Sequence, residues 1–299
     1  MSTRRTFPWV APHWPAGVAR PVEARHLGID YDTQWSRRYP ARLVRAMFLD
    51  NVSRPLAHAI AAPDVRGAEL LELVEPPAIF VANHASHLDT GLLLSILPLR
   101  FRHKTVVAAA ADYFFDRRWK AHAWALGLGA IPIERHKVNR KSADTAATLL
   151  DEGWNLIIFP EGGRSPDGWF QEFRGGEAYL ARRTGRPVVP VYIEGTGRIL
   201  PKDGGRPRRH KTRITFGTPM TLAEGENARR FGARVETTLA TMADEGRSDW
   251  WTARRRAAAG TTPSPRGPEA AAWRRSWALG PDPEKSSAVD EGRWALSAD

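Results

Sequence analysis

Two residues in a short polar stretch have the types needed for general base catalysis. The stretch NHASHLDT, residues 83–90, interrupts apolar sequence, and its His84 and Asp89 lie five positions apart. Five residues separate two side chains by about 140° on a helix and place them on opposite faces of a strand, so neither regular element lets them touch. If a strand ends near Asn83 and a helix begins near Asp89, the turn between them can fold Asp89 beneath the imidazole of His84.

A carboxylate in that position would make His84 a general base. It would accept a hydrogen bond from one ring nitrogen, fix the tautomer and leave the other nitrogen basic and directed outward. The sequence contains no cysteine, and no serine nucleophile motif is evident in it. The hydroxyl that the base activates could therefore belong to a substrate.

Two further roles for this stretch stay open at the level of sequence. Asp89 precedes an apolar helical run and could simply cap its helix. His84, His87 and Asp89 could also bind a metal, as in a metal-dependent hydrolase, although no HExxH pattern accompanies them. We expect no metal, and we assign His87 a structural or peripheral role.

Polar residues also follow two further apolar runs, at 130–133 and 155–160. Two arginines at neighbouring strand ends suit a phosphate, because each guanidinium can donate two parallel hydrogen bonds to it. Paired glycines let backbone amides approach the same anion. The alternatives are that each arginine is a solvated surface residue and that Glu161 only positions an arginine or anchors its turn. The substrate-binding residues predicted here are Arg135, Glu161, Gly162, Gly163 and Arg164.

The elements that must position these residues alternate between strands and helices. Apolar, β-rich runs predict strands at 78–82, 105–109, 130–133, 155–159, 188–193 and 213–216. Helical patterns lie between them, at 89–97, 113–128, 140–150 and 172–184. The alternation predicts an α/β fold with a mixed, largely parallel sheet flanked by helices. In such sheets, binding groups gather in the loops after the carboxyl ends of the strands.

The 299 residues exceed the usual size of one compact domain. We predict an N-terminal extension with a helical segment (1–70), a catalytic domain (71–245) and a partly disordered, Trp/Arg-rich tail (246–299). The first segment contains a helix over 41–62, bent or divided near Pro55. A helix over 221–244 ends the catalytic domain, and the poorly ordered tail holds at most one or two short helices.

Composition limits the compartment and the partners. The net charge of +11 favours partners that carry phosphate, such as anionic lipid, phosphorylated metabolites or nucleic acid. No helix-turn-helix, zinc finger or RNP pattern is present, so we expect no nucleic acid. Without cysteine the chain forms no disulfide, which fits a reducing compartment. We find no signal peptide and expect a cytoplasmic protein.

Membrane contact is expected to be peripheral, on an anionic surface at the cytoplasmic face. The longest apolar stretch, residues 91–99, is interrupted by Pro98 and is far shorter than the roughly 20 residues that span a bilayer. Tryptophans among arginines suit such an interface. The candidates are Trp250, Trp251, Trp273 and Trp277 in the tail, Trp9 and Trp14 near the N-terminus, and the helix over 41–62.

Four motifs in order, NHASHLD, GAIPIER, FPEGGRS and VVPV, make the sequence resemble the glycerolipid acyltransferase family typified by 1-acylglycerol-3-phosphate acyltransferase. The resemblance covers roughly residues 76–219. It implies that His84 and Asp89 match the HX4D pair of the family and that Arg135 matches the arginine of its second block. Glu161, Gly162 and Arg164 match its FPEGTRS block. The sequence departs from that block at Gly163, where the family commonly has threonine.

The resemblance implies an enzyme that moves a fatty acyl chain from acyl-CoA or acyl carrier protein to the free hydroxyl of 1-acyl-glycerol-3-phosphate, giving phosphatidic acid. Another lysophospholipid or a hydroxyl-bearing polar lipid would need the same base. His84 would take the hydroxyl proton while Asp89 holds its ring. Arg135 and Arg164 would hold the acceptor phosphate, and amides near Gly162 would stabilise the oxyanion. No cofactor or metal is required.

Overall fold

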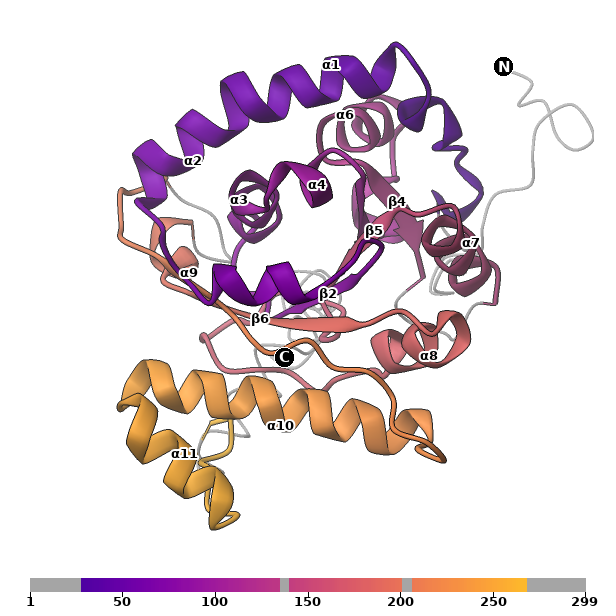
Figure 1. Cartoon of the computed structure of the whole chain (residues 1–299). Coiled ribbons are helices and arrows are strands. Elements are labelled where there is room, and N and C mark those ends of the chain that lie inside the picture. The colour runs from indigo at the N-terminus through magenta and orange to yellow at the C-terminus, as the bar shows by residue number, and fades with distance from the viewer. Residues whose placement is uncertain (1–27, 135–139, 201–205, 268–299) are drawn as a thin grey trace, which may run out of the picture.

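The computed structural model describes residues 28–134, 140–200 and 206–267 (Figure 1). Within these residues the strands form one seven-stranded sheet in the order β1-β7-β6-β2-β5-β3-β4. All neighbouring strands are parallel except β6 and β7, which confirms the predicted mixed, largely parallel sheet. The strands are β1 (Asp64–Arg66), β2 (Ile79–Ala82), β3 (Thr105–Ala110), β4 (Ala130–Ile133), β5 (Asn155–Ile158), β6 (Val188–Glu194) and β7 (Arg213–Phe216).

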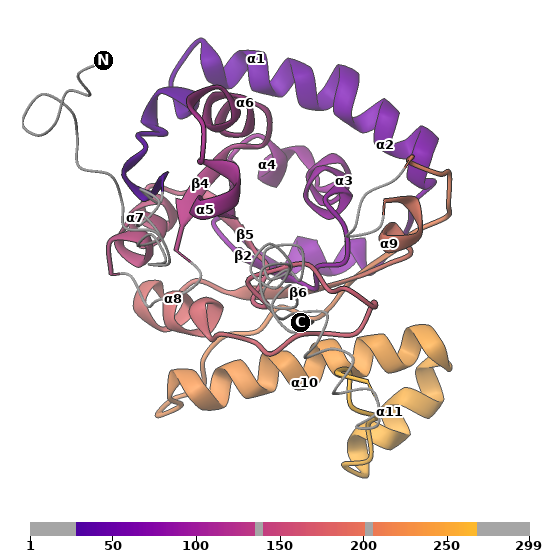
Figure 2. The ribbon, with the colours of Figure 1, turned by 180° about the vertical axis from the view of Figure 1, so that it is seen from behind.

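Helices lie on both sides of this sheet, as predicted (Figures 1 and 2). The longer ones are α1 (Ala41–Phe48), α2 (Arg54–Ala61), α3 (Leu88–Ile96), α6 (Arg118–Leu128), α7 (Arg140–Asp151), α8 (Gly176–Thr184), α10 (Ala228–Arg247) and α11 (Trp250–Ala258). The short ones are α4 (Leu99–Arg102), α5 (Ala111–Phe114) and α9 (Thr196–Ile199). Three 3-10 segments span Gly28–Asp30, Gln34–Arg37 and Ala68–Leu73.

The strands bury both of their faces because successive side chains alternate between two cores. In β2, Ile79 and Val81 belong to one core, whereas Phe80 and Ala82 belong to the other. The first core includes buried residues of α7, α8 and α10, and the second includes residues of α2 and α3. This burial is the reason that the central strands are continuous apolar runs in the sequence.

The predicted helix over 41–62 divides next to Pro55. A π-helical turn, Leu49–Ser53, joins α1 to α2, and Pro55 is the second residue of α2. Proline has no N–H to donate to the preceding turn, so the helical hydrogen-bond pattern must change there. The two helices nevertheless continue as one long rod along the outside of the molecule (Figure 1).

Some predicted boundaries differ from the structure for local reasons. The single helix predicted over 113–128 is two helices, α5 and α6, because Arg117 between them is extended. The helix predicted from 172 begins at Gly176, after Gly175 in the left-handed conformation (φ 73°). The helix predicted from 221 begins at Ala228, where the Asn227 side chain caps it by accepting from the amide of Arg230. Strand β1 was not predicted.

The described part of the predicted tail, residues 246–267, is folded against the domain. Asp249 caps α11, and the Arg256 guanidinium donates to the buried carboxylate of Asp244 in α10 at 2.8 Å. Further along, the carbonyl of Pro265 accepts from the amide of Phe170 at 2.9 Å. The described part of the tail contains one short helix, α11, and Trp273 and Trp277 lie outside the described residues.

A buried carboxylate in the α8–α10 interface predicts a pH-dependent stability. Burial raises the pKa of Glu177 to about 7; a hydrogen bond from its own backbone amide opposes this rise, and the charge of Glu236 adds a smaller increase. Because the folded pKa exceeds the ordinary value of 4.5, the protonated form favours the fold. This stabilisation is full below pH 4.5 and is lost as the pH rises through about 7.

We therefore expect Glu177→Gln to be more stable than the unsubstituted protein at pH 8, by up to about 3 kcal/mol. The difference should shrink towards pH 4.5, because the native carboxyl group is then neutral in the folded state. Urea unfolding at several pH values measures this, with the exposed Glu224→Gln as the control. If the free energy of unfolding of Glu177→Gln depended on pH in the same way as that of the unsubstituted protein, the expectation would be wrong.

Candidate active site

The strand that leads into the polar stretch is prolonged by a side chain. The Asn83 amide nitrogen Nδ2 donates to the carbonyl of Ile193 in β6 at 2.8 Å, and its Oδ1 accepts from the Ile193 amide at 2.7 Å. The side chain thus makes the two hydrogen bonds that a backbone residue of β2 would make to its neighbour. The turn after β2 consequently starts from a fixed position.

The predicted contact between His84 and Asp89 is present. His84 Nδ1 lies 2.9 Å from Asp89 Oδ2, and the same oxygen accepts from the amides of Ala85 at 2.7 Å and Ser86 at 2.8 Å. With two amides donating to an acceptor-only oxygen, Nδ1–H of His84 is the third donor. The lone pair of a neutral imidazole is then on Nε2, the geometry of a general base.

Asp89 does not cap its helix in the usual way. The N-cap of α3 is His87, and Asp89 is the second helical residue, with its carboxylate turned back to the amides before the helix. Its side chain is fully buried, whereas that of His84 is 13% exposed. The imidazole stacks on Phe159 with ring centroids 4.1 Å apart, which fixes the plane of the ring.

Glu161 links the turn after β2 to the loop after β5. Its Oε1 accepts from the amide of His84 at 2.8 Å, and its Oε2 accepts from the amide of Gln171 at 2.8 Å. The residue is only 1% exposed. The prediction that Glu161 binds substrate is therefore corrected: its carboxylate is buried and anchors the backbone on both sides.

The loop after β5 wraps around the same turn. The amide of Ser165 donates to the His84 carbonyl at 2.7 Å, and Gln171 Nε2 donates to the carbonyls of Gly163 and Arg164 at 3.2 and 2.7 Å. The Gly162 amide itself donates to the Phe159 carbonyl within the turn, and the oxyanion role of amides near Gly162 stays a prediction. Gly162 has φ +68°, and a Cβ on it would lie 2.8 Å from Arg174 Nε. Nothing in the local sequence pattern distinguishes Arg174 as a neighbour of this loop.

His87 belongs to the surroundings of the His84–Asp89 pair. Burial and, after it, the positive charge of Arg164 lower its pKa to about 4, so it is neutral at physiological pH. Its Nε2 lies 3.2 Å from the hydroxyl of Tyr113, and the two rings stack. In the part of the chain that the structure describes, no three His, Cys, Asp or Glu side chains are grouped to hold a metal.

Arg135, the second predicted phosphate ligand, lies outside the described residues. One assumption behind that prediction is wrong, because the ends of β4 and β5 are not neighbours. Strand β3 lies between them, and β5 pairs with β2 instead. The crossover through α7 skips one strand, so the loop after β5 meets the His84 turn directly.

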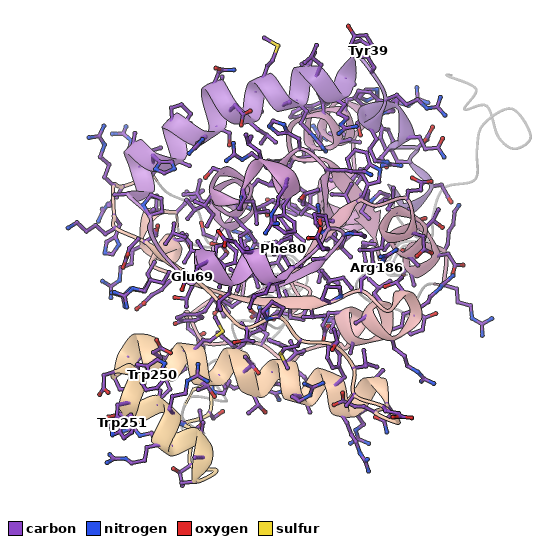
Figure 3. The ribbon with its side chains drawn as sticks, viewed as in Figure 1. Tyr39, Glu69, Phe80, Arg186, Trp250 and Trp251 are labelled. Carbon is purple, nitrogen blue, oxygen red and sulfur yellow. The ribbon has the colours of Figure 1, made fainter. Side chains whose placement is uncertain are left out.

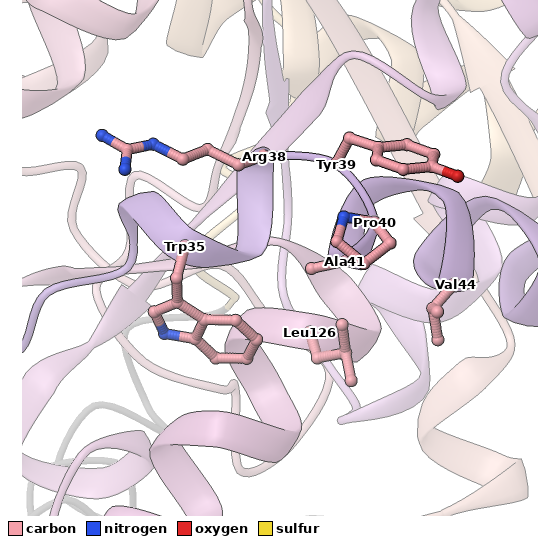
Figure 4. Close-up of a pocket in the computed structure, with 7 residues that line it drawn as sticks. All are labelled: Trp35, Arg38, Tyr39, Pro40, Ala41, Val44 and Leu126. Atoms are coloured by element: carbon pink, nitrogen blue, oxygen red, sulfur yellow. The ribbon is translucent and has the colours of Figure 1, made fainter.

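A pocket of about 450 Å³ lies away from this turn, beside α1 and α6 (Figure 4). It is lined by Trp35, Arg38, Tyr39, Pro40, Ala41, Val44 and Leu126. None of these residues belongs to the predicted site. The pocket is instead part of an apolar surface along α1.

Comparison with known proteins agrees with the motif order. Residues 62–194 match the model of the family described as Acyltransferase, and this segment includes His84, Asp89 and the loop 161–164. The part of the chain that carries the candidate site is thus similar in sequence to the acyltransferase family.

Two curated relatives show the extent of the similarity. A chloroplastic 1-acyl-sn-glycerol-3-phosphate acyltransferase of Brassica napus is 34% identical over 143 residues, which are 46% of this chain and 39% of the relative. A 1-acyl-sn-glycerol-3-phosphate acyltransferase of Pseudomonas aeruginosa is 30% identical over 171 residues, 56% of this chain and 62% of the relative. The chain thus spans less than two thirds of the length of either relative.

Among solved structures, the chain is similar to the 1-acyl-sn-glycerophosphate (LPA) acyltransferase PlsC from Thermotoga maritima. That protein is 23% identical, with a TM-score of 0.49, and the alignment covers 69% of this chain and 80% of that one.

Because Glu161 accepts hydrogen bonds from two buried backbone amides, its substitution should lower the stability of the fold. In Glu161→Gln one carboxylate oxygen becomes an NH₂ group that faces a backbone N–H, so one buried amide loses its acceptor. We expect a loss of about 1–3 kcal/mol in the free energy of unfolding. Chemical denaturation measures it, with the exposed Glu172→Gln as the matched control. Equal stability of the two variants would contradict the anchoring role.

Proposed function

We propose that the chain is an O-acyltransferase that moves a fatty acyl group from an acyl thioester to the free hydroxyl of 1-acyl-glycerol-3-phosphate, giving phosphatidic acid. The observation that carries the proposal is the Nδ1 contact of His84 with the buried Asp89, which leaves Nε2 as the basic nitrogen. The names of the relatives favour this acceptor over other hydroxyl-bearing lipids.

The proposed reaction needs one base and no covalent enzyme intermediate. His84 Nε2 takes the proton of the acceptor hydroxyl while that oxygen attacks the thioester carbonyl carbon. The carbon–sulfur bond then breaks, and the leaving thiolate takes the proton back from the imidazolium. Asp89 stabilises the imidazolium between these steps through its hydrogen bond to Nδ1–H.

The acceptor phosphate is assigned to the arginines of the site. The charge of Arg164 contributes to lowering the pKa of His87, a residue of the same turn as His84, and this supports a role for Arg164 in holding the phosphate. A guanidinium suits phosphate because it donates two parallel hydrogen bonds. The predicted contribution of Arg135 remains part of the proposal.

Substitution of the two central residues tests the proposal. We expect His84→Ala to lower kcat for acyl transfer to lysophosphatidic acid by roughly 10²–10⁴-fold, because the proton acceptor is lost. Asp89→Asn should also lower kcat strongly, because an amide cannot stabilise the imidazolium as a carboxylate does. The matched control is the exposed His58→Ala on α2, and circular dichroism verifies folding. A His84→Ala variant as active as the control would rule out the proposed base.

We also propose that the protein takes its acceptor from a membrane that it contacts peripherally. No helix in the described ranges is both long and apolar enough to cross a bilayer. An exposed surface along α1 and α2, here called the apolar row, is the proposed contact. It consists of Tyr39, Leu43, Val44, Met47, Phe48, Val52 and Leu56, spaced mostly by four residues. An apolar helical face of this kind suits the headgroup boundary of a bilayer.

The tryptophans of α11 compete for the same role. Trp250 and Trp251 stack on each other at 6.0 Å and are 54% and 68% exposed. They lie at the opposite end of the molecule from Tyr39, the first residue of the apolar row (Figure 3). One flat membrane cannot contact both ends. We favour the apolar row because it has seven exposed apolar side chains rather than two.

Vesicle flotation distinguishes the two surfaces. We expect Leu43→Ser/Met47→Ser/Leu56→Ser to weaken binding to vesicles of phosphatidylcholine and phosphatidylglycerol at least about tenfold, because three side chains no longer bury apolar area. Trp250→Ser/Trp251→Ser should float like the unsubstituted protein. The opposite result, with binding lost only in the tryptophan variant, would assign the membrane contact to α11.

A further inference from the structure

A group of exposed cations lies near the proposed base without belonging to it. The group, here called the basic cluster, consists of Arg198, Arg206, Arg208, Arg209 and Lys211, all exposed. Within the described residues, none of the five forms an ion pair with a carboxylate. The adjacent Arg213, in contrast, pairs with Asp64 and Glu194. As far as the described residues go, the cluster is therefore a positive patch without a paired carboxylate.

The cluster is connected to the His84 turn through α9. The amide of Arg208 donates to the carbonyl of Ile199 at 3.0 Å, at the end of α9. The next carbonyl, that of Leu200, accepts from Ser86 Oγ at 2.9 Å. The amide of Ser86 is also one of the two that donate to Asp89. Two hydrogen bonds and a few residues thus separate the cluster from the proposed base.

The backbone of the cluster is held in place from two sides. The amides of His210 and Thr212 donate to the carbonyls of Ile60 and Ala61 at the end of α2, at 3.2 and 2.8 Å. Figure 2 shows α9 beside that end of α2. Gly195, with φ +94°, approaches so closely that a Cβ on it would lie 2.6 Å from the Lys211 carbonyl oxygen. The backbone that carries these cations is therefore packed against the end of α2 and against Gly195.

We propose that the basic cluster binds the phosphate groups of the nucleotide part of acyl-CoA, which makes acyl-CoA the donor. This inference rests on the proposed function, since that function requires a thioester whose carrier is anionic. Guanidinium groups bind phosphate oxygens in a bidentate manner, and several of them side by side match a ligand with several phosphates. The flexible pantetheine arm then carries the thioester from the cluster to His84.

Lipid headgroups offer the same phosphate chemistry, so the position of the cluster matters. The cluster borders the end of α2, next to the apolar row, but it is attached to α9, where a Cβ added to Gly197 would lie 3.8 Å from the Ala85 side chain of the His84 turn. A donor must bring its sulfur to that turn, whereas a bulk lipid headgroup has no need to be there. This closeness favours the donor.

The test compares two variants that remove the same charge. The first is Arg206→Gln/Arg208→Gln/Arg209→Gln, and the control is Arg182→Gln/Arg229→Gln/Arg230→Gln, with three exposed arginines of α8 and α10. Calorimetric titration with CoA itself requires no turnover. We expect the cluster variant to bind CoA roughly tenfold more weakly than the control, the effect of a few exposed ion pairs. Pantetheine, which lacks the nucleotide phosphates, should not distinguish the variants.

Kinetics provide the second readout. The cluster variant should raise KM for acyl-CoA by a similar factor and leave kcat unchanged, while its rates with an acyl-pantetheine donor equal those of the control. CoA binding that is the same in both variants would overturn the inference. Weaker flotation on phosphatidylglycerol vesicles with unchanged CoA affinity would also overturn it and assign the cluster to lipid headgroups. Cluster-dependent CoA binding by a protein that transfers no acyl group would support the site and reject the proposed function.

Discussion

The arrangement of the site depends on one carboxylate oxygen, Oδ2 of Asp89. It accepts hydrogen bonds from His84 Nδ1 and from the amides of Ala85 and Ser86, all within 2.9 Å. A buried carboxylate is costly unless it is hydrogen-bonded, so these donors stabilise the acid and the acid in turn fixes the turn. The same oxygen therefore holds the backbone of the turn and sets the tautomer of the imidazole. This is why the two residues must be five apart with a turn between them.

Three neighbouring parts of the fold hold that turn from different sides. Asn83 joins it to β6, Glu161 joins it to the loop after β5, and Ser86 reaches the segment after α9. The strand order puts β2 between β5 and β6, so these contacts are short. The basic nitrogen of His84 is held still by groups that need not touch a substrate. Such supporting contacts are what give a catalytic group its defined direction.

The local sequence pattern predicts the central strands and the His84–Asp89 contact, but it does not predict the strand order or the long-range contacts of the site. The central strands follow from apolar runs, because they are buried on both faces, and the His84–Asp89 contact follows because five-residue spacing excludes regular elements. Strand β1 could not be predicted, since Asp64 and Arg66 leave it no apolar run. Neither the strand order nor the contacts of Asn83 with Ile193 and of Glu161 with His84 follow from local pattern, because these partners are 110 and 77 positions apart. The assumed adjacency of β4 and β5 failed for the same reason.

The net charge of +11 indicates a partner only once the positions of the basic residues on the surface are known. The proposed reaction joins a membrane-bound acceptor to a water-soluble donor, so it needs two approaches to one base. The apolar row and the basic cluster are separate in character, yet they meet where the amides of His210 and Thr212 bond to the end of α2. A protein resting on its apolar row would keep the cluster next to the membrane and open to water. There the repulsion among its cations would be relieved by a phosphate-bearing ligand.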